Sequence, residues 1–174
     1  MALRPKHIYK RLNAARLDNV SLRVYLKDML DAYHVVRLEH DQWMKGESPA
    51  KLTAVSQAFI DCLSRIFLVS PKALSMVNSP RPHSRDSQGR VRGELYGSCA
   101  SYGNIRIYLL TASRGKPTAF KTFFNTLVHE WVHHYDFEAL GDTIHCSGFY
   151  QRVATVYNTC IESEEISCRR NQAD

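Results

Sequence analysis

Apolar residues recur every three to four positions through the first part of the chain. Over residues 21–45 and again over residues 50–68 this helical period predicts two amphipathic helices. Ser21 is a candidate N-cap of the first helix, and the Gly46-Glu47-Ser48-Pro49 segment separates the two helices. The apolar stripes are Leu22, Leu26, Met29, Tyr33 and Val36 in the first helix and Leu52, Val55, Phe59, Leu63 and Ile66 in the second. The N-terminal half is therefore predicted to be helical.

The pattern changes after Ser70-Pro71, which turns the chain. Residues 78–90 are rich in Pro, Ser and Arg and are predicted to form a mobile loop. Residues 118–140 contain no Gly or Pro and are predicted to form a long helix. Thr118 is a candidate N-cap of this helix, and Gly141 is a candidate C-cap.

This long helix carries the most informative motif, His129-Glu130-Trp131-Val132-His133. Positions four apart lie on one helical face, so the two histidines can offer imidazoles to one Zn²⁺. Glu130 is about 100° away from His129 around the helix. It is poorly aimed to be a ligand but well placed to reach a metal-bound water. The HExxH motif is typical of metal-dependent peptidases.

A catalytic zinc site needs a third protein ligand and a position left for water. His145 is the best candidate, because residues 141–144 form a short reversal that would return the chain toward the metal. Asp142 is a weaker alternative, since the chain has left the helix by that point.

Other polar residues near the motif receive other interpretations. Asp136 lies on the metal-facing side one turn beyond His133, so we expect it to hold that imidazole rather than bind the metal. Glu138 is about 180° from His129 and faces away. His134 is interpreted as a polar helix residue without a metal role.

Four features, in matching order over residues 93–157, resemble a SprT-like zinc metallopeptidase domain of the Spartan/SprT family. The first two are strands, the third is the HExxH helix, and the fourth is a third histidine at the start of a new helix. Cys146 stands where the family usually has a glycine after that histidine. The matching segments read Tyr96-Gly97-Ser98-Cys99-Ala100-Ser101-Tyr102, Ile105-Arg106-Ile107-Tyr108-Leu109, Thr126-Leu127-Val128-His129-Glu130-Trp131-Val132-His133 and His145-Cys146-Ser147-Gly148-Phe149.

The resemblance implies an α+β, zincin-like fold. We expect the helical N-terminal half to be followed by a small antiparallel sheet, which packs on the HExxH helix and on a C-terminal helix. One domain is expected over residues 1–174, with a helical portion at 1–77 and a zinc-binding catalytic core at 78–174.

The resemblance also implies a zinc-dependent endopeptidase that acts on DNA-associated proteins. His129, His133 and His145 would hold Zn²⁺, and Glu130 would be the general base that later protonates the leaving amine. Two further interpretations remain open: a metallopeptidase that does not depend on DNA, and a non-catalytic zinc-containing binding module. Glu130 argues against the second, because a structural site needs no general base.

Two details of such a site stay open at the level of sequence. The donor to the oxyanion is a guess among Tyr150, Tyr102 and Arg106. The strand at residues 105–110 is our hypothesis for the cleft rim, where an extended substrate would pair by its backbone.

The charge distribution favours DNA as a partner without requiring it. The net charge is +6, and about half of the 23 Lys and Arg residues lie in three groups. Such groups neutralise phosphates, although they are also found as solvated faces of basic proteins. The groups are Arg4, Lys6, Lys10, Arg11 and Arg16; Arg81, Arg85, Arg90 and Arg92; and Arg114, Lys116 and Lys121.

Cysteine usage and hydropathy indicate the compartment. Five cysteines without framework spacing are typical of reduced thiols. The first residues lack the apolar core of a signal peptide, and no apolar stretch approaches transmembrane length. We therefore expect a cytoplasmic protein, with nucleoid or nuclear association as an option, and no membrane partner.

Overall fold

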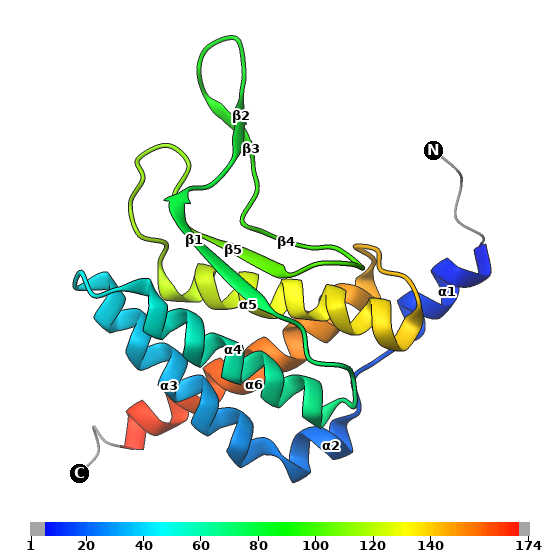
Figure 1. The fold of residues 1–174 in the computed structure, drawn as a ribbon. Helices are drawn as coiled ribbons and strands as arrows, with labels where there is room; N and C mark the ends of the chain where they lie inside the picture. Colours follow the sequence, from blue (N-terminus) through cyan, green and yellow to red (C-terminus); the bar gives the residue numbers. More distant parts are fainter. Residues whose placement is uncertain (1–5, 171–174) are drawn as a thin grey trace.

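The computed structural model describes residues 6–170, without the side chains of residues 165–170, so Arg4 of the first basic group lies outside the description. The predicted α+β class is confirmed (Figure 1). The elements are α1 (Lys6–Ala14), α2 (Asn19–Val24), α3 (Leu26–Met44), α4 (Pro49–Ile66), β1 (Leu74–Pro80), β2 (His83–Arg85), β3 (Val91–Glu94), β4 (Gly97–Cys99), β5 (Ile105–Leu110), α5 (Phe120–Tyr135), the π-helical turn η1 (Asp136–Leu140) and α6 (Ser147–Arg170).

The N-terminal portion is helical, as predicted, but its first long helix is divided. The expected helix at 21–45 is α2 followed by α3, with the break at Tyr25. Asp18, rather than Ser21, is the N-cap of α2, because its carboxylate accepts the backbone N–H groups of Val20 and Ser21. The second predicted helix is α4, where Ser48 is the N-cap and Pro49 opens the helix.

The helix that carries the HExxH motif begins later than predicted. Thr118 is not its N-cap, because its backbone N–H pairs with the Leu109 carbonyl and its hydroxyl accepts a hydrogen bond from Arg81. α5 therefore begins at Phe120 without a side-chain cap. At the other end, Gly141 adopts φ 72°, which confirms the predicted glycine C-cap.

The main sheet has the order β1-β5-β4 and is mixed. β4 pairs antiparallel with β5, but β1 pairs parallel with it, so the predicted all-antiparallel sheet is wrong. The parallel pairing arises because the chain leaves β1, forms a separate hairpin and the edge strand, and only then returns as β5. β1 also begins at Leu74, before the boundary expected at residue 78.

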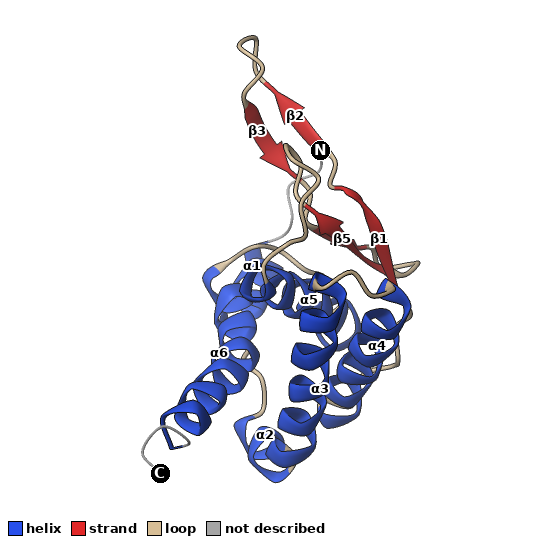
Figure 2. Cartoon of the chain, turned by 90° about the vertical axis from the view of Figure 1, so that its left-hand side faces the viewer, coloured by secondary structure: helices blue, strands red, loops and turns tan. Residues whose placement is uncertain are grey.

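The predicted loop at residues 78–90 is largely structured as a strand end and a hairpin. β2 and β3 pair antiparallel and project from the sheet, away from the helices (Figures 1 and 2). Asp86 closes the turn. Its backbone N–H donates to the Arg90 carbonyl, its own carbonyl accepts from the Gly89 N–H, and its carboxylate accepts from the Arg90 N–H. Gly89 takes a left-handed φ of 77° there. The turn residues that suggested a loop therefore build a hairpin.

One core joins the helical portion to the sheet and the later helices. β5 alternates, with Ile105, Ile107 and Leu109 turned into the core, and the sheet packs on α5 while α4 lies under β1. α6 packs against α5, α1 and α3, so residues from both expected portions share that core. Within residues 6–170, no helix has the length and apolarity needed to cross a membrane.

Candidate metal centre

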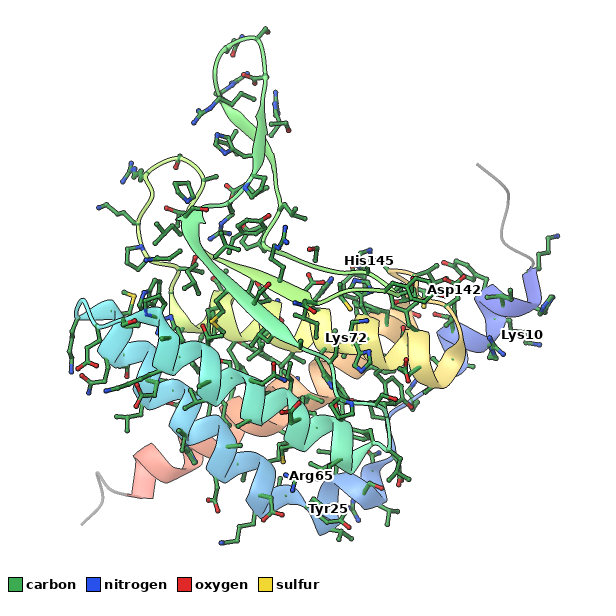
Figure 3. The ribbon with its side chains drawn as sticks, viewed as in Figure 1. Lys10, Tyr25, Arg65, Lys72, Asp142 and His145 are labelled. Carbon is green, nitrogen blue, oxygen red and sulfur yellow. The ribbon has the colours of Figure 1, made fainter. Side chains whose placement is uncertain are left out.

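Two structural elements bring three histidines together. His129 and His133 lie one turn apart on α5, and His145 lies on the segment between η1 and α6 (Figure 3). The left-handed backbone at Gly141 ends the helix and reverses the chain. His145 thereby returns to the face of α5 that carries the motif, as the sequence predicted.

The three imidazoles face one another through their Nε2 atoms. The Nε2 atoms of His129 and His145 are 3.0 Å apart, those of His133 and His145 are 3.0 Å apart, and those of His133 and His129 are 3.2 Å apart. Among the described residues, these three form the group of side chains that could hold a metal ion. Three nitrogen donors that converge at this spacing fit one metal ion with about 2 Å bonds.

Burial keeps His129 and His133 in the neutral form that binds metals. It lowers the pKa of His129 to about 4, and the neighbouring His145 lowers it further. Burial likewise lowers the pKa of His133 to about 3, with His129 and His145 as smaller causes. Because a ligating imidazole must be unprotonated, both side chains are ready to bind a metal ion at neutral pH.

Phe149, on the first turn of α6, packs against all three histidines. Its ring centroid lies 4.8 Å from that of His129, 4.4 Å from that of His133 and 5.0 Å from that of His145. The ring is fully buried. Its contacts therefore restrict the orientation of the three imidazoles.

The structure places the weaker ligand candidates outside the cluster. Asp142 accepts the backbone N–H of Thr143 at 2.8 Å, and Glu138 is exposed. His134 is buried on another side of α5, where its Nε2 lies 2.7 Å from the Ser70 carbonyl. His134 is thus a buried residue of α5 that contacts a backbone carbonyl.

Asp136 contacts His133 indirectly, through Thr143. The Thr143 hydroxyl lies 2.8 Å from His133 Nδ1 and donates to Asp136 Oδ2 at 3.2 Å. Arg152 of α6 donates to the same Asp136 oxygen at 2.7 Å. The predicted role of Asp136 in holding the imidazole therefore depends on two residues that sequence reasoning missed. The position of Arg152 could have been noticed in the sequence, because it is a charged residue within the apolar stripe of α6. That stripe is formed by Phe149, Val153 and Val156.

Glu130 is 6% exposed and lines the same cleft as the histidines. Burial raises its pKa to about 7. Gly97 of β4 lies directly against it: a Cβ at this position would be 2.8 Å from Glu130 Cγ and 2.9 Å from the Arg106 carbonyl oxygen. The absence of a side chain at residue 97 is what lets the strand approach α5 so closely.

The cleft above the cluster has a volume of about 910 Å³. Residues 94–99 line one side of it, and one face of α5 lines the other, from Lys121 to His133. β4 is the edge strand next to the cleft, whereas β5 lies between β1 and β4. Our hypothesis that residues 105–110 form the rim is therefore wrong, because both edges of β5 are already paired.

The three candidate donors to the oxyanion differ in whether they line the cleft. Tyr150 lines it, and its ring stacks on His145 with centroids 5.9 Å apart. Tyr102 and Arg106 lie instead along a neighbouring surface hollow beside residues 98–104. Of the three, Tyr150 is the residue that shares the cleft with the histidines and Glu130.

No protein-family model, curated protein or solved structure gives a significant match to this chain. Its function is therefore inferred from the geometry of the site and from the motif.

Proposed function

We propose that this protein is a zinc-dependent endopeptidase of the SprT-like type. The observation that carries the proposal is the combination of three converging imidazoles with Glu130 in one cleft. Burial is the influence that shifts the pKa of Glu130, and no hydrogen bond or ion pair engages its carboxylate among the side chains that the structure describes. The side chain is largely buried but lines the cleft, so its carboxylate can meet a water or a substrate there, which favours a chemical role. A purely structural metal site would not need it.

Zinc is the metal that best suits this set of donors. Three neutral imidazoles are typical of catalytic zinc sites. Nitrogen ligands of tetrahedral zinc are separated by about 3.3 Å at the usual bond length, and the three Nε2 atoms are 3.0–3.2 Å apart. When bound, zinc supplies Lewis acidity that lowers the pKa of a water toward about 7 and polarises a carbonyl group.

The side chains of the cleft supply proton transfer and substrate binding. Glu130 takes a proton from the attacking water and later delivers it to the leaving amine. A group whose pKa is near 7 can do both at neutral pH. Tyr150 is the candidate donor to the oxyanion.

An extended peptide fits the shape of the cleft. The exposed edge of β4 offers backbone groups for pairing, which is a mode that reads backbone more than side chains. Lys121 and His133 are twelve residues apart on α5, so the wall spans about 18 Å. That length accommodates about five extended residues. A binding region of this length is suited to cleavage within a chain.

The hairpin β2–β3 supports an association with DNA. Arg85, Arg90 and Arg92 are all exposed on it, alongside two acidic residues, Asp86 and Glu94. Asp86 Oδ2 accepts the Nε–H groups of Arg90 and Arg92, each at 3.0 Å. These bonds orient the two guanidinium groups and leave their terminal nitrogens for other acceptors, such as phosphates. The protein substrate would then be one that is itself bound to DNA.

Cleavage of a basic DNA-binding protein tests the proposal. Wild type and Glu130→Gln are compared without DNA, with duplex DNA and with single strands. Cleavage that requires Glu130 and increases with DNA is the expected result. Cleavage that requires Glu130 but is indifferent to DNA would restrict the proposal to a general metallopeptidase. Equal cleavage by the two proteins, or none with any DNA form, would contradict it.

A further inference from the structure

A chain of buried polar groups runs from His133 to the N-terminal helix. His133 Nδ1 contacts the Thr143 hydroxyl, which donates to Asp136, and Asp136 accepts from Arg152. Arg152 also donates through Nη1 to the carbonyl groups of Leu12, at 3.0 Å, and Ala15, at 2.7 Å. Asp136 and Arg152 are both fully buried. Four segments of the chain, α1, η1, the 141–146 loop and α6, thus meet behind one of the three histidines.

The directions of these hydrogen bonds determine the tautomer of His133. A threonine hydroxyl has a single proton, and here it is donated to the Asp136 carboxylate. The same oxygen can therefore only accept from His133, which places the imidazole proton on Nδ1. Nε2 is then left with its lone pair, and it is the atom that faces His129 and His145.

The ion pair behind Thr143 holds that arrangement. Arg152 and Asp136 are joined at 2.7 Å with no exposed surface on either side chain. A buried pair of this kind contributes little net stability compared with apolar residues of the same volume. Its effect is to fix the charged state and the position of Asp136, so that the carboxylate remains the acceptor of the Thr143 proton.

We propose that Thr143 is a positioning residue that holds His133 in the tautomer that binds metal through Nε2. Asp136 and Arg152 hold Thr143 in place. This inference rests on the proposed metal site. Outer hydrogen-bond partners of ligating histidines typically change metal affinity 10- to 100-fold when removed. Thr143→Val removes the hydroxyl with little change in shape, and Thr143→Ser keeps it.

Zinc affinity provides the first test, measured by competition with a chromophoric chelator. Thr143→Val is expected to bind zinc about 10- to 100-fold more weakly than wild type, and Thr143→Ser is expected to restore most of the affinity. The thermal midpoints of the metal-free proteins show whether the folds are equal. An affinity of Thr143→Val within twofold of wild type, or of Thr143→Ser as low as that of Thr143→Val, would overturn the proposal.

The tautomer itself is measured by ¹⁵N NMR of the imidazole in the metal-free protein. Wild type is expected to carry the His133 proton on Nδ1, and Thr143→Val a mixture of both tautomers. A wild-type proton on Nε2 would overturn the positioning role whatever the affinities are. The two proposals can also be separated. A wild type that binds zinc but cleaves no protein contradicts the peptidase and leaves this inference standing, whereas a wild type that binds no zinc contradicts both.

Discussion

The two sides of the cleft are built in opposite ways. We call one side the floor; it comprises α5, residues 136–147 and α6. Its polar groups make buried contacts between segments that are far apart in sequence. The rim, which comprises residues 94–99 and the hairpin β2–β3, has a three-residue edge strand and exposed side chains along β2. Gly97 is the point where the two sides touch.

This difference suits the function that we propose for each side. Metal ligands must be held within a fraction of an ångström, which requires packed neighbours and satisfied hydrogen bonds. Groups that meet a polypeptide or a nucleic acid must remain accessible and keep backbone or charge available. Changes in the floor should therefore affect chemistry and stability, while changes in the rim should affect binding.

The largest effect is expected from Glu130→Gln in the floor. The amide keeps the shape but cannot take the proton, so turnover should fall by about 10²- to 10⁴-fold. Zinc content should be unchanged. Glu138→Gln, at an exposed position of η1, is the matched control and should retain full activity. Initial rates of peptide cleavage and metal analysis of the same preparations check both statements.

The next largest effect concerns stability, and it comes from Arg152→Met. The substitution leaves Asp136 buried without its cation and should lower the free energy of unfolding by about 3–5 kcal/mol. Arg23→Met, at an exposed position of α2, is the control. Urea denaturation of the metal-free proteins gives the comparison. The Asp136→Ala/Arg152→Met double variant should lose much less than the sum of its parts; additive losses would contradict coupling between the two residues.

Gly97→Ala tests the contact between floor and rim. The added Cβ would overlap Glu130 Cγ and the Arg106 carbonyl, so the strand or the carboxyl group must shift. Displacements of about 1 Å at a catalytic site cost up to roughly 10²-fold in rate. Gly93→Ala is the control, because a Cβ there meets only the flexible Ser84 hydroxyl at 3.2 Å. Equal kcat/KM in the two variants would show that β4 does not set the position of Glu130.

The smallest effect on chemistry is expected in the hairpin. Replacing Arg85, Arg90 and Arg92 with Gln should leave peptide cleavage without DNA unchanged. DNA affinity should fall, and the slope of log affinity against log salt should become shallower by about 0.9 for each phosphate that the protein no longer neutralises. Replacing Lys27 and Lys51 on the helices, both exposed, is the comparison. An unchanged slope in the arginine variant would separate the hairpin from DNA binding.

The sequence predicted those parts of the site that depend on local spacing. His129 and His133 share a helical face because they are four residues apart, and Gly141 reverses the chain because it adopts a left-handed φ. The return of His145 followed from that reversal. The role of Thr143 could not be predicted in this way, since it depends on Arg152 and on the end of α1, more than 100 residues away along the chain.

The wrong predictions about the fold also concern contacts between segments that are far apart in sequence. The period of the apolar residues locates the helices, and turn residues locate the ends of elements. Neither shows which strands pair. The parallel partner of β5 is β1, which a 24-residue excursion separates from it. Thr118 has the right chemistry for an N-cap, yet its hydroxyl accepts from Arg81 of a distant segment. Non-local hydrogen bonds decided both outcomes.

The central claim is that His129, His133 and His145 hold one zinc ion, and the zinc content of three proteins tests it most directly. Wild type, His145→Ala and Asp142→Ala are purified side by side, dialysed against a weak chelator and measured by mass spectrometry of the metal. The account predicts about one zinc per chain in wild type and Asp142→Ala and a large loss in His145→Ala, because a site with two histidines binds weakly. Stoichiometric zinc in His145→Ala together with its loss in Asp142→Ala, or no zinc in wild type, would contradict it.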